Sequence, residues 1–106
     1  MTLITLKEPV AVAAALKQIE RTFTGKSADY AEDTDWRSNF RDMAKQLHLP
    51  GVTDRSACEL LIALKQSRLR ALRANGRDPS NEGTLDTLLD RAVYAVIAFA
   101  MALEDG

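Results

Sequence analysis

Four stretches of this chain place apolar residues every three or four positions, and no stretch alternates apolar and polar residues over a useful length. That spacing puts the apolar side chains on one face of an α-helix. The predicted helices cover residues 9–23, 36–47, 54–74 and 84–103. The chain of 106 residues is long enough for one domain with a modest core. The sequence therefore predicts a single all-α domain, residues 1–106, folded as a small bundle of about four helices.

Residues that favour helix ends set the limits of these segments. The candidates are Pro9, Thr53 or Asp54 and Thr84 at the starts, and Thr24-Gly25 and Asn75-Gly76 at the ends. The connections 26–35 and 77–83 are then longer than the turns of a helical bundle usually are. Loops of this length form solvated surface about as often as they contact a ligand.

Composition excludes several classes of function. A net charge of −1 gives no support to direct nucleic-acid binding, which needs a basic excess. A single cysteine, Cys58, rules out an intrachain disulfide, and no cysteine/histidine cluster suggests zinc. The apolar run 92–103 is too short to span a membrane, and the first residues lack the pattern of a signal peptide. We expect a soluble, cytoplasmic protein.

The fourth predicted helix begins with two carboxylates, Asp86 and Asp90, although the rest of it is the most apolar part of the chain. In the helix before it, Lys65 and Arg68 interrupt two neighbouring apolar stripes. A cation in an apolar stripe must be paired or reach water, because an isolated buried charge costs several kcal/mol.

Two interpretations fit these charges. In the structural one, Asp86 lies at a helix start that favours negative charge, and Asp90 pairs with Lys65 or Arg68. In the functional one, the two aspartates, one helical turn apart, hold a Mg²⁺ ion directly or through its waters. The cations Lys65, Arg68 and Arg77 then bind the phosphates of a nucleotide.

Several short stretches of the chain resemble a known family. They are KSADY (26–30), NFR (39–41), LKQSRL (64–69) and GTLDTLLDRAVYAVI (83–97). Their order and spacing are similar to those of the phage and bacterial nucleotide modification associated domain proteins. That family is in turn similar to the all-α nucleoside triphosphate pyrophosphohydrolases of the MazG and dUTPase type, which bind Mg²⁺ through acidic residues of a helical bundle.

The resemblance implies roles for individual residues. It implies Asp86, Asp90 and, on the preceding helix, Glu59 as metal ligands, with Lys65 and Arg68 facing the phosphates. The resemblance places Lys26, Asp29 and Tyr30 at the mouth of the site, where Tyr30 can stack on a base. It also implies that Asn39 reads a base edge or caps the loop.

The chain departs from the pyrophosphohydrolase pattern at one point. Those enzymes pair an E-x-x-E helix with an E-x-x-D helix, and no E-x-x-E occurs here. The resemblance therefore supports nucleotide handling more than hydrolysis. A Mg²⁺-dependent pyrophosphohydrolase-like protein, a nucleotide binder without catalysis and a purely structural or protein-interaction bundle all stay open.

Self-association is a further expectation. The segment 92–101 is apolar on nearly every face, and a four-helix monomer of this size leaves little to cover it. We expect a homo-oligomer.

Overall fold

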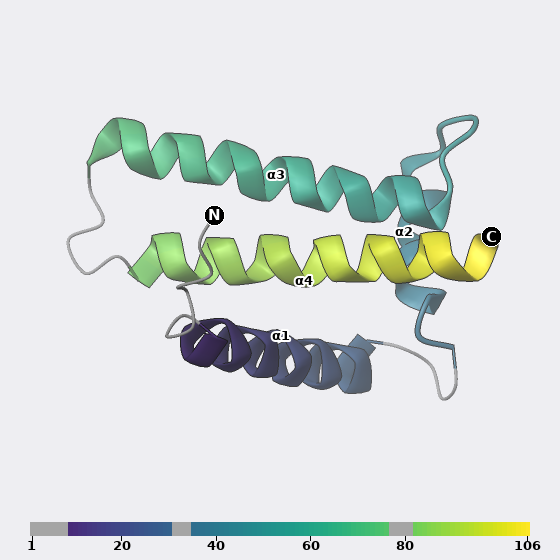
Figure 1. Ribbon diagram of the computed structural model, residues 1–106. Coiled ribbons are helices and arrows are strands. Elements are labelled where there is room, and N and C mark those ends of the chain that lie inside the picture. The colour runs from purple at the N-terminus through teal and green to yellow at the C-terminus, as the bar shows by residue number, and fades with distance from the viewer. Residues whose placement is uncertain (1–8, 31–34, 77–81) are drawn as a thin grey trace.

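A computed structural model describes residues 9–30, 35–76 and 82–106 of the chain (Figure 1). The described residues form four helices and no strand. They are α1 (Pro9–Tyr30), α2 (Ser38–Leu47), α3 (Asp54–Asn75) and α4 (Glu82–Asp105). The prediction of an all-helical chain is confirmed. No helix in this part of the chain is long and apolar enough to cross a membrane.

Helix α4 is the central element. It runs antiparallel to α3 on one side and packs against α1 on the other, while the short α2 packs on α3 near the end where α3 begins (Figure 1). The α3–α4 contact is the most extensive of the three. The helix order along the chain therefore differs from the order in space, because α4 lies between the first helix and the third.

The core lies where α2, α3 and α4 meet. Its central members are Phe40 from α2, Cys58 from α3, and Val93, Ile97 and Met101 from α4. The three α4 residues are four positions apart, so they share one face of the helix. Burial of this face is what orients α4 toward α2 and α3.

The ends of α3 follow from its cap residues. The Thr53 hydroxyl accepts a hydrogen bond from the Ser56 N–H (3.2 Å), which satisfies one of the amides at the start of the helix. At the other end Gly76 takes a left-handed conformation, φ 58°, and its N–H donates to the Leu72 carbonyl. Both predicted caps of α3 are confirmed.

Two other predicted boundaries are wrong. The stop at Thr24-Gly25 does not end α1, which continues to Tyr30, so part of the predicted loop 26–35 is helix. The Thr24 hydroxyl donates to the Glu20 carbonyl within the helix (2.9 Å), and a single glycine costs a helix only about 1 kcal/mol. Helix α4 already begins at Glu82, so Thr84 lies inside the helix and does not cap it.

Candidate functional site

Polar side chains cross the contact between α3 and α4 in its half that is remote from α2. Lys65 Nζ lies 3.0 Å from Asp90 Oδ2, and Arg68 Nε donates to the Thr87 hydroxyl over 3.0 Å. Next to the first pair along both helices, Arg91 donates to Gln66. We call this set of three cross-helix pairs the polar ladder.

The ladder is partly open to solvent. The side chains of Lys65 and Asp90 are 27% and 26% exposed. Thr87, by contrast, is buried, and its hydroxyl also donates to the Gly83 carbonyl (2.6 Å). Arg68 is an exposed residue, and its Nε is anchored at this buried hydroxyl. The pairing of Asp90 with Lys65 was one of the two pairings that the structural interpretation proposed.

The predicted metal ligands do not come together as a group of three. Asp86 is exposed on α4 one turn before Asp90. Glu59, 63% exposed, lies 3.9 Å from Arg55 on its own helix. Within 9–30, 35–76 and 82–106, no three histidine, cysteine, aspartate or glutamate side chains could hold a metal ion.

Magnesium requires oxygen ligands in near-octahedral geometry. Of the two predicted ligands on α4, Asp86 and Asp90, the second is already neutralised by Lys65. The described carboxylates therefore do not fit a magnesium site by themselves, and we derive no chemical step through a metal.

Of Lys26, Asp29, Tyr30, Asn39 and Arg77, the remaining predicted site residues, only Asn39 has a described side chain. Lys26, Asp29 and Tyr30 lie in the last turns of α1, but their side chains are outside the described part of the structure, as is Arg77 altogether. Asn39 is half-buried in the first turn of α2, the helix near the start of α3 (Figure 1). Among the predicted nucleotide ligands whose side chains the structure describes, Lys65 and Arg68 lie together and Asn39 lies apart from them.

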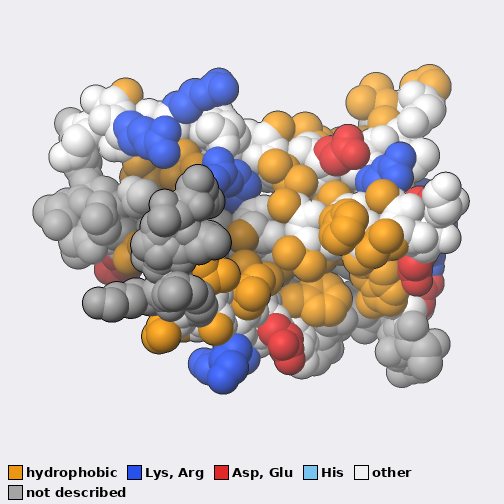
Figure 2. Space-filling view, in the orientation of Figure 1, with side chains coloured by type: hydrophobic (Ala, Val, Ile, Leu, Met, Phe, Trp, Pro, Cys, Tyr) orange, Lys and Arg blue, Asp and Glu red, His pale blue; other side chains and the backbone are white. Residues whose placement is uncertain are grey.

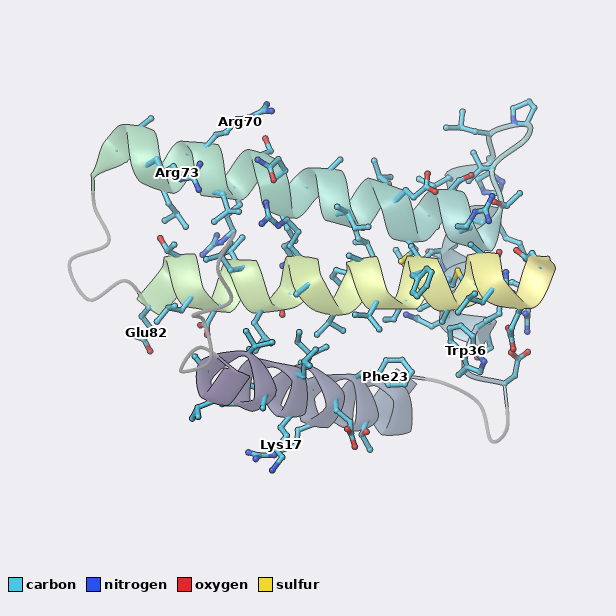
Figure 3. The ribbon with its side chains drawn as sticks, viewed as in Figure 1. Lys17, Phe23, Trp36, Arg70, Arg73 and Glu82 are labelled. Atoms are coloured by element: carbon cyan, nitrogen blue, oxygen red, sulfur yellow. The ribbon has the colours of Figure 1, made fainter. Side chains whose placement is uncertain are left out.

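More cations follow on α3. Arg70 and Arg73 are exposed one and two turns beyond the ladder's first residue, Lys65. Arg70 points away from α4, as Figure 3 shows. This half of α3 is consequently basic, while the facing start of α4 carries Glu82, Asp86 and Asp90.

A second charged cluster surrounds Arg37, a residue that sequence reasoning missed. Its guanidinium makes two hydrogen bonds to Asp54 (2.7 and 2.9 Å) and also binds Glu104 (3.2 Å) and Asp105 (2.9 Å). It stacks on Trp36, with 5.8 Å from Cζ to the ring centroid. We call this cluster the Arg37 clasp, because it ties the starts of α2 and α3 to the end of α4.

The clasp shifts the ionisation of its members. Hydrogen bonds from Arg37 are the main cause that holds the pKa of Asp54 below its usual value, and the same is true of the pKa of Asp105. In turn, hydrogen bonds to Asp54 and then Asp105 raise the pKa of Arg37. The carboxylates that bind the Arg37 guanidinium lie 17 to 68 positions away along the chain, and no local pattern signals such a contact.

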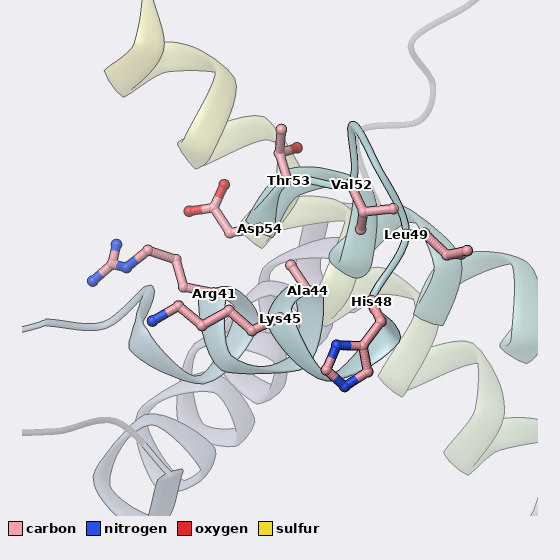
Figure 4. A pocket seen from close by; sticks show the side chains of 8 residues that line it. All are labelled: Arg41, Ala44, Lys45, His48, Leu49, Val52, Thr53 and Asp54. Atoms are coloured by element: carbon pink, nitrogen blue, oxygen red, sulfur yellow. The ribbon is translucent and has the colours of Figure 1, made fainter.

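A shallow groove of about 440 Å³ lies between the end of α2 and the start of α3. Figure 4 shows Arg41 and Lys45 pointing to the same end of it as Asp54, with Leu49 and Val52 at the other. Arg41 pairs with Asp35, and Asp54 is held by Arg37. His48 caps α2 in a left-handed conformation, φ 52°. Of the charged side chains that line the groove, Arg41 and Asp54 are therefore already paired.

Cys58 is a fully buried core residue, and its surroundings disfavour the reactive thiolate. Its Sγ donates to the Tyr94 carbonyl (3.2 Å), and burial is the main cause that raises the pKa of the thiol to about 11. A thiol with so high a pKa is almost fully protonated at neutral pH, whereas the reactive form is the thiolate.

Comparison of the chain with protein-family models, with curated proteins and with solved structures returned no match.

Proposed function

We propose that this chain is a nucleotide-handling protein and that the polar ladder between α3 and α4 is where the phosphates bind. The observation that carries the proposal is the position of Lys65 and Arg68, two cations from one helix turn, at a partly exposed seam. Ammonium and guanidinium groups at such a seam are good ligands for phosphate oxygens. The resemblance of residues 64–69 and 83–97 to nucleotide-handling proteins points to the same place.

Binding at this site exchanges one anion for another. Asp90 now neutralises Lys65, and an entering phosphate oxygen takes over that role while Arg68 stays anchored at Thr87. We propose binding as the principal activity. Hydrolysis in the pyrophosphohydrolase manner would require a set of carboxylates that the described residues do not supply.

The test measures affinity for a panel of ribonucleoside and deoxynucleoside triphosphates by calorimetry, with and without Mg²⁺. We expect Arg68→Gln to weaken binding about tenfold, because one charge-assisted contact contributes roughly 1.4 kcal/mol. The matched control is Arg70→Gln, which removes an equal charge from the same helix but on the side away from α4 (Figure 3), and it should change affinity less than twofold.

Two results would contradict the proposal. If no nucleotide binds or raises the melting temperature, with or without Mg²⁺, the chain does not handle nucleotides in this way. If Arg70→Gln weakens binding as much as Arg68→Gln, the ladder is not the site. Release of pyrophosphate in the same mixtures would add hydrolysis to binding.

The second candidate is a purely structural or protein-interaction bundle. One observation favours it, namely that Lys65, Arg68 and Arg91 already have partners across the interface. The variant Asp90→Ala separates the two functions. If the ladder is purely structural, Asp90→Ala should lower the free energy of unfolding, because Lys65 is left without its partner. If the ladder binds phosphate, the affinity of Asp90→Ala for nucleotides should stay the same or rise, because the Asp90 carboxylate no longer competes for Lys65.

A further inference from the structure

Among the described residues, Thr87 is the one polar side chain that the fold buries, with 2% exposed. Its hydroxyl donates to the Gly83 carbonyl one helical turn earlier (2.6 Å) and accepts from Arg68 Nε (3.0 Å). A hydroxyl has a single hydrogen, so the bond to Gly83 leaves its lone pairs for Arg68. That bond also selects one of the two χ1 rotamers that threonine adopts in a helix. The backbone of α4 therefore fixes the position of the oxygen that Arg68 binds.

The bond to Thr87 occupies only Nε, the guanidinium nitrogen nearest the backbone of Arg68. The guanidinium carries further donors on Nη1 and Nη2, in the same plane. Within the described part of the chain, neither of these two nitrogens has a hydrogen-bond partner. With Nε held from the buried side, the two Nη groups can donate a pair of parallel hydrogen bonds to two oxygens of one phosphate.

The other two cations of the polar ladder are held differently. Lys65 faces the Asp90 carboxylate at 3.0 Å, so a phosphate must displace an anion there. Arg91 is half-buried and binds Gln66 through Nη1, one of the nitrogens that a phosphate would use. Arg68 is exposed and has a neutral partner. It is therefore the ladder cation that is best placed to bind a phosphate without losing an existing contact.

Figure 2 shows Lys and Arg side chains gathered over the second half of α3. Arg68, Arg70 and Arg73 are all exposed there. The field of such a patch attracts anions to this surface, but it does not place them. A free arginine loses much rotamer entropy when it binds a ligand. An arginine that is already held by Thr87 loses less, so its contact with a phosphate is stronger.

We propose that Thr87 is a positioning residue of the phosphate site, which fixes Arg68 through Nε so that Nη1 and Nη2 bind two oxygens of one phosphate group. This role rests on the proposed function and adds to it the residue that orients the main cation. Any phosphate of a polyphosphate chain offers two such oxygens. Neither a base nor a sugar is needed for the contact, so inorganic triphosphate is a sufficient probe.

The first test observes Arg68 directly, in proton–nitrogen correlation spectra of the chain without ligand. We expect the Nε–H of Arg68 to exchange slowly with water, because it is bonded to a buried oxygen. Thr87→Val keeps the shape of the side chain and removes the oxygen, so it should raise the exchange rate to that of the exposed Arg70. Thr87→Ser keeps the hydroxyl and should preserve the slow exchange.

The second test measures binding of inorganic triphosphate by calorimetry. Thr87→Val should weaken binding about three- to tenfold, the range expected when one flexible side chain has to be ordered on binding. Thr87→Val combined with Arg68→Gln should bind no more weakly than Arg68→Gln alone, because Thr87 acts through Arg68. The matched control is Thr22→Val on α1, which removes a hydroxyl with the same bond one turn back, to the Gln18 carbonyl (2.8 Å). It should leave the affinity unchanged.

Thr87→Val should stay folded. Valine fills the same space, the Gly83 carbonyl keeps its hydrogen bond from the α4 backbone, and the exposed Arg68 is solvated by water. Circular dichroism checks the helix content. Thr87→Ser should bind triphosphate about as tightly as the wild-type chain, which a merely structural loss at this position would not explain.

The outcomes separate the two proposals. If Arg68→Gln weakens binding but Thr87→Val does not, or if the Nε–H of Arg68 exchanges equally fast in the wild-type chain and in Thr87→Val, Thr87 is not a positioning residue, although the ladder can still bind phosphate. If the wild-type chain binds neither triphosphate nor any nucleotide, the ladder is not a phosphate site and Thr87 has no role in binding.

Discussion

Arg37 shows how one side chain can join three helices. Arg37 directly precedes α2, and its side chain binds carboxylates at the start of α3 and at the end of α4. The Arg37 and Asp54 side chains are only 14% and 12% exposed. A pair at such depth is worth more than one at the surface, and removal of one partner leaves the other poorly solvated. The clasp is therefore a strong determinant of how the helix ends meet.

We expect Arg37→Met to lower the free energy of unfolding by about 2–3 kcal/mol, because Asp54 loses its bidentate partner at a poorly hydrated position. Arg41→Met is the matched control. It removes the surface pair with Asp35, in which both side chains are more than 40% exposed, and should cost ~0.5 kcal/mol or less. Urea denaturation measures both. Equal losses in the two variants would refute the role given to the clasp.

At the scale of elements, the helices differ in how their ends are determined. Helix α3 has a hydroxyl cap at its start and a left-handed glycine at its end, and both were evident as cap residues in the sequence. Helix α1 continues past Gly25, the position expected to end it. The difference lies in the backbone conformation, because Gly76 has φ 58° whereas Gly25 is not among the glycines with positive φ.

This contrast predicts opposite effects of the same substitution. Gly25→Ala should stabilise the chain by about 0.5–1 kcal/mol, since alanine is the better helix former and a Cβ there meets nothing within 4 Å. Gly76→Ala should destabilise it by about 1 kcal/mol, because an L side chain is strained in the left-handed region. Thermal and urea denaturation compare the two. Stabilisation at Gly76, or a loss at Gly25, would contradict the assignment of these two helix ends.

At the scale of the molecule, the clasp gives stability a defined pH dependence. The pKa values of Asp54 and Asp105 are lowered in the fold, so the folded chain binds fewer protons than the unfolded chain in mildly acidic solution. The stability that these carboxylates contribute is present above the unfolded pKa of about 3.9. It is lost as the pH falls from there through the folded values.

We therefore expect the free energy of unfolding of the wild-type chain to fall more steeply below about pH 4 than that of Arg37→Met. The variant lacks the cation that lowers both pKa values, so its carboxylates bind protons in the folded and unfolded states more equally. Melting temperatures between pH 2 and pH 6 test this. If the melting temperatures of the wild-type chain and of Arg37→Met fall in parallel as the pH is lowered, the clasp does not cause the acid sensitivity.

The sequence by itself determined the helical class, the approximate positions of four helices and both caps of α3. These features depend on residues at most a few positions apart, so local spacing and cap chemistry are sufficient to predict them. The contact of Lys65 with Asp90 was also open to prediction, because two cations in apolar stripes require partners on the next amphipathic helix.

Only the tertiary structure decided which of these charges meet, and it left Glu59, Asp86 and Asp90 without the grouping that a metal would need. It alone assembled the Arg37 clasp, whose members are up to 68 positions apart. It also buried one line of apolar residues of α4, Val93, Ile97 and Met101, and left Val96, Phe99 and Leu103 exposed. The sequence could not make that division, because α4 is apolar almost all round and only the placement of α1 and α3 determines which of its faces remains open.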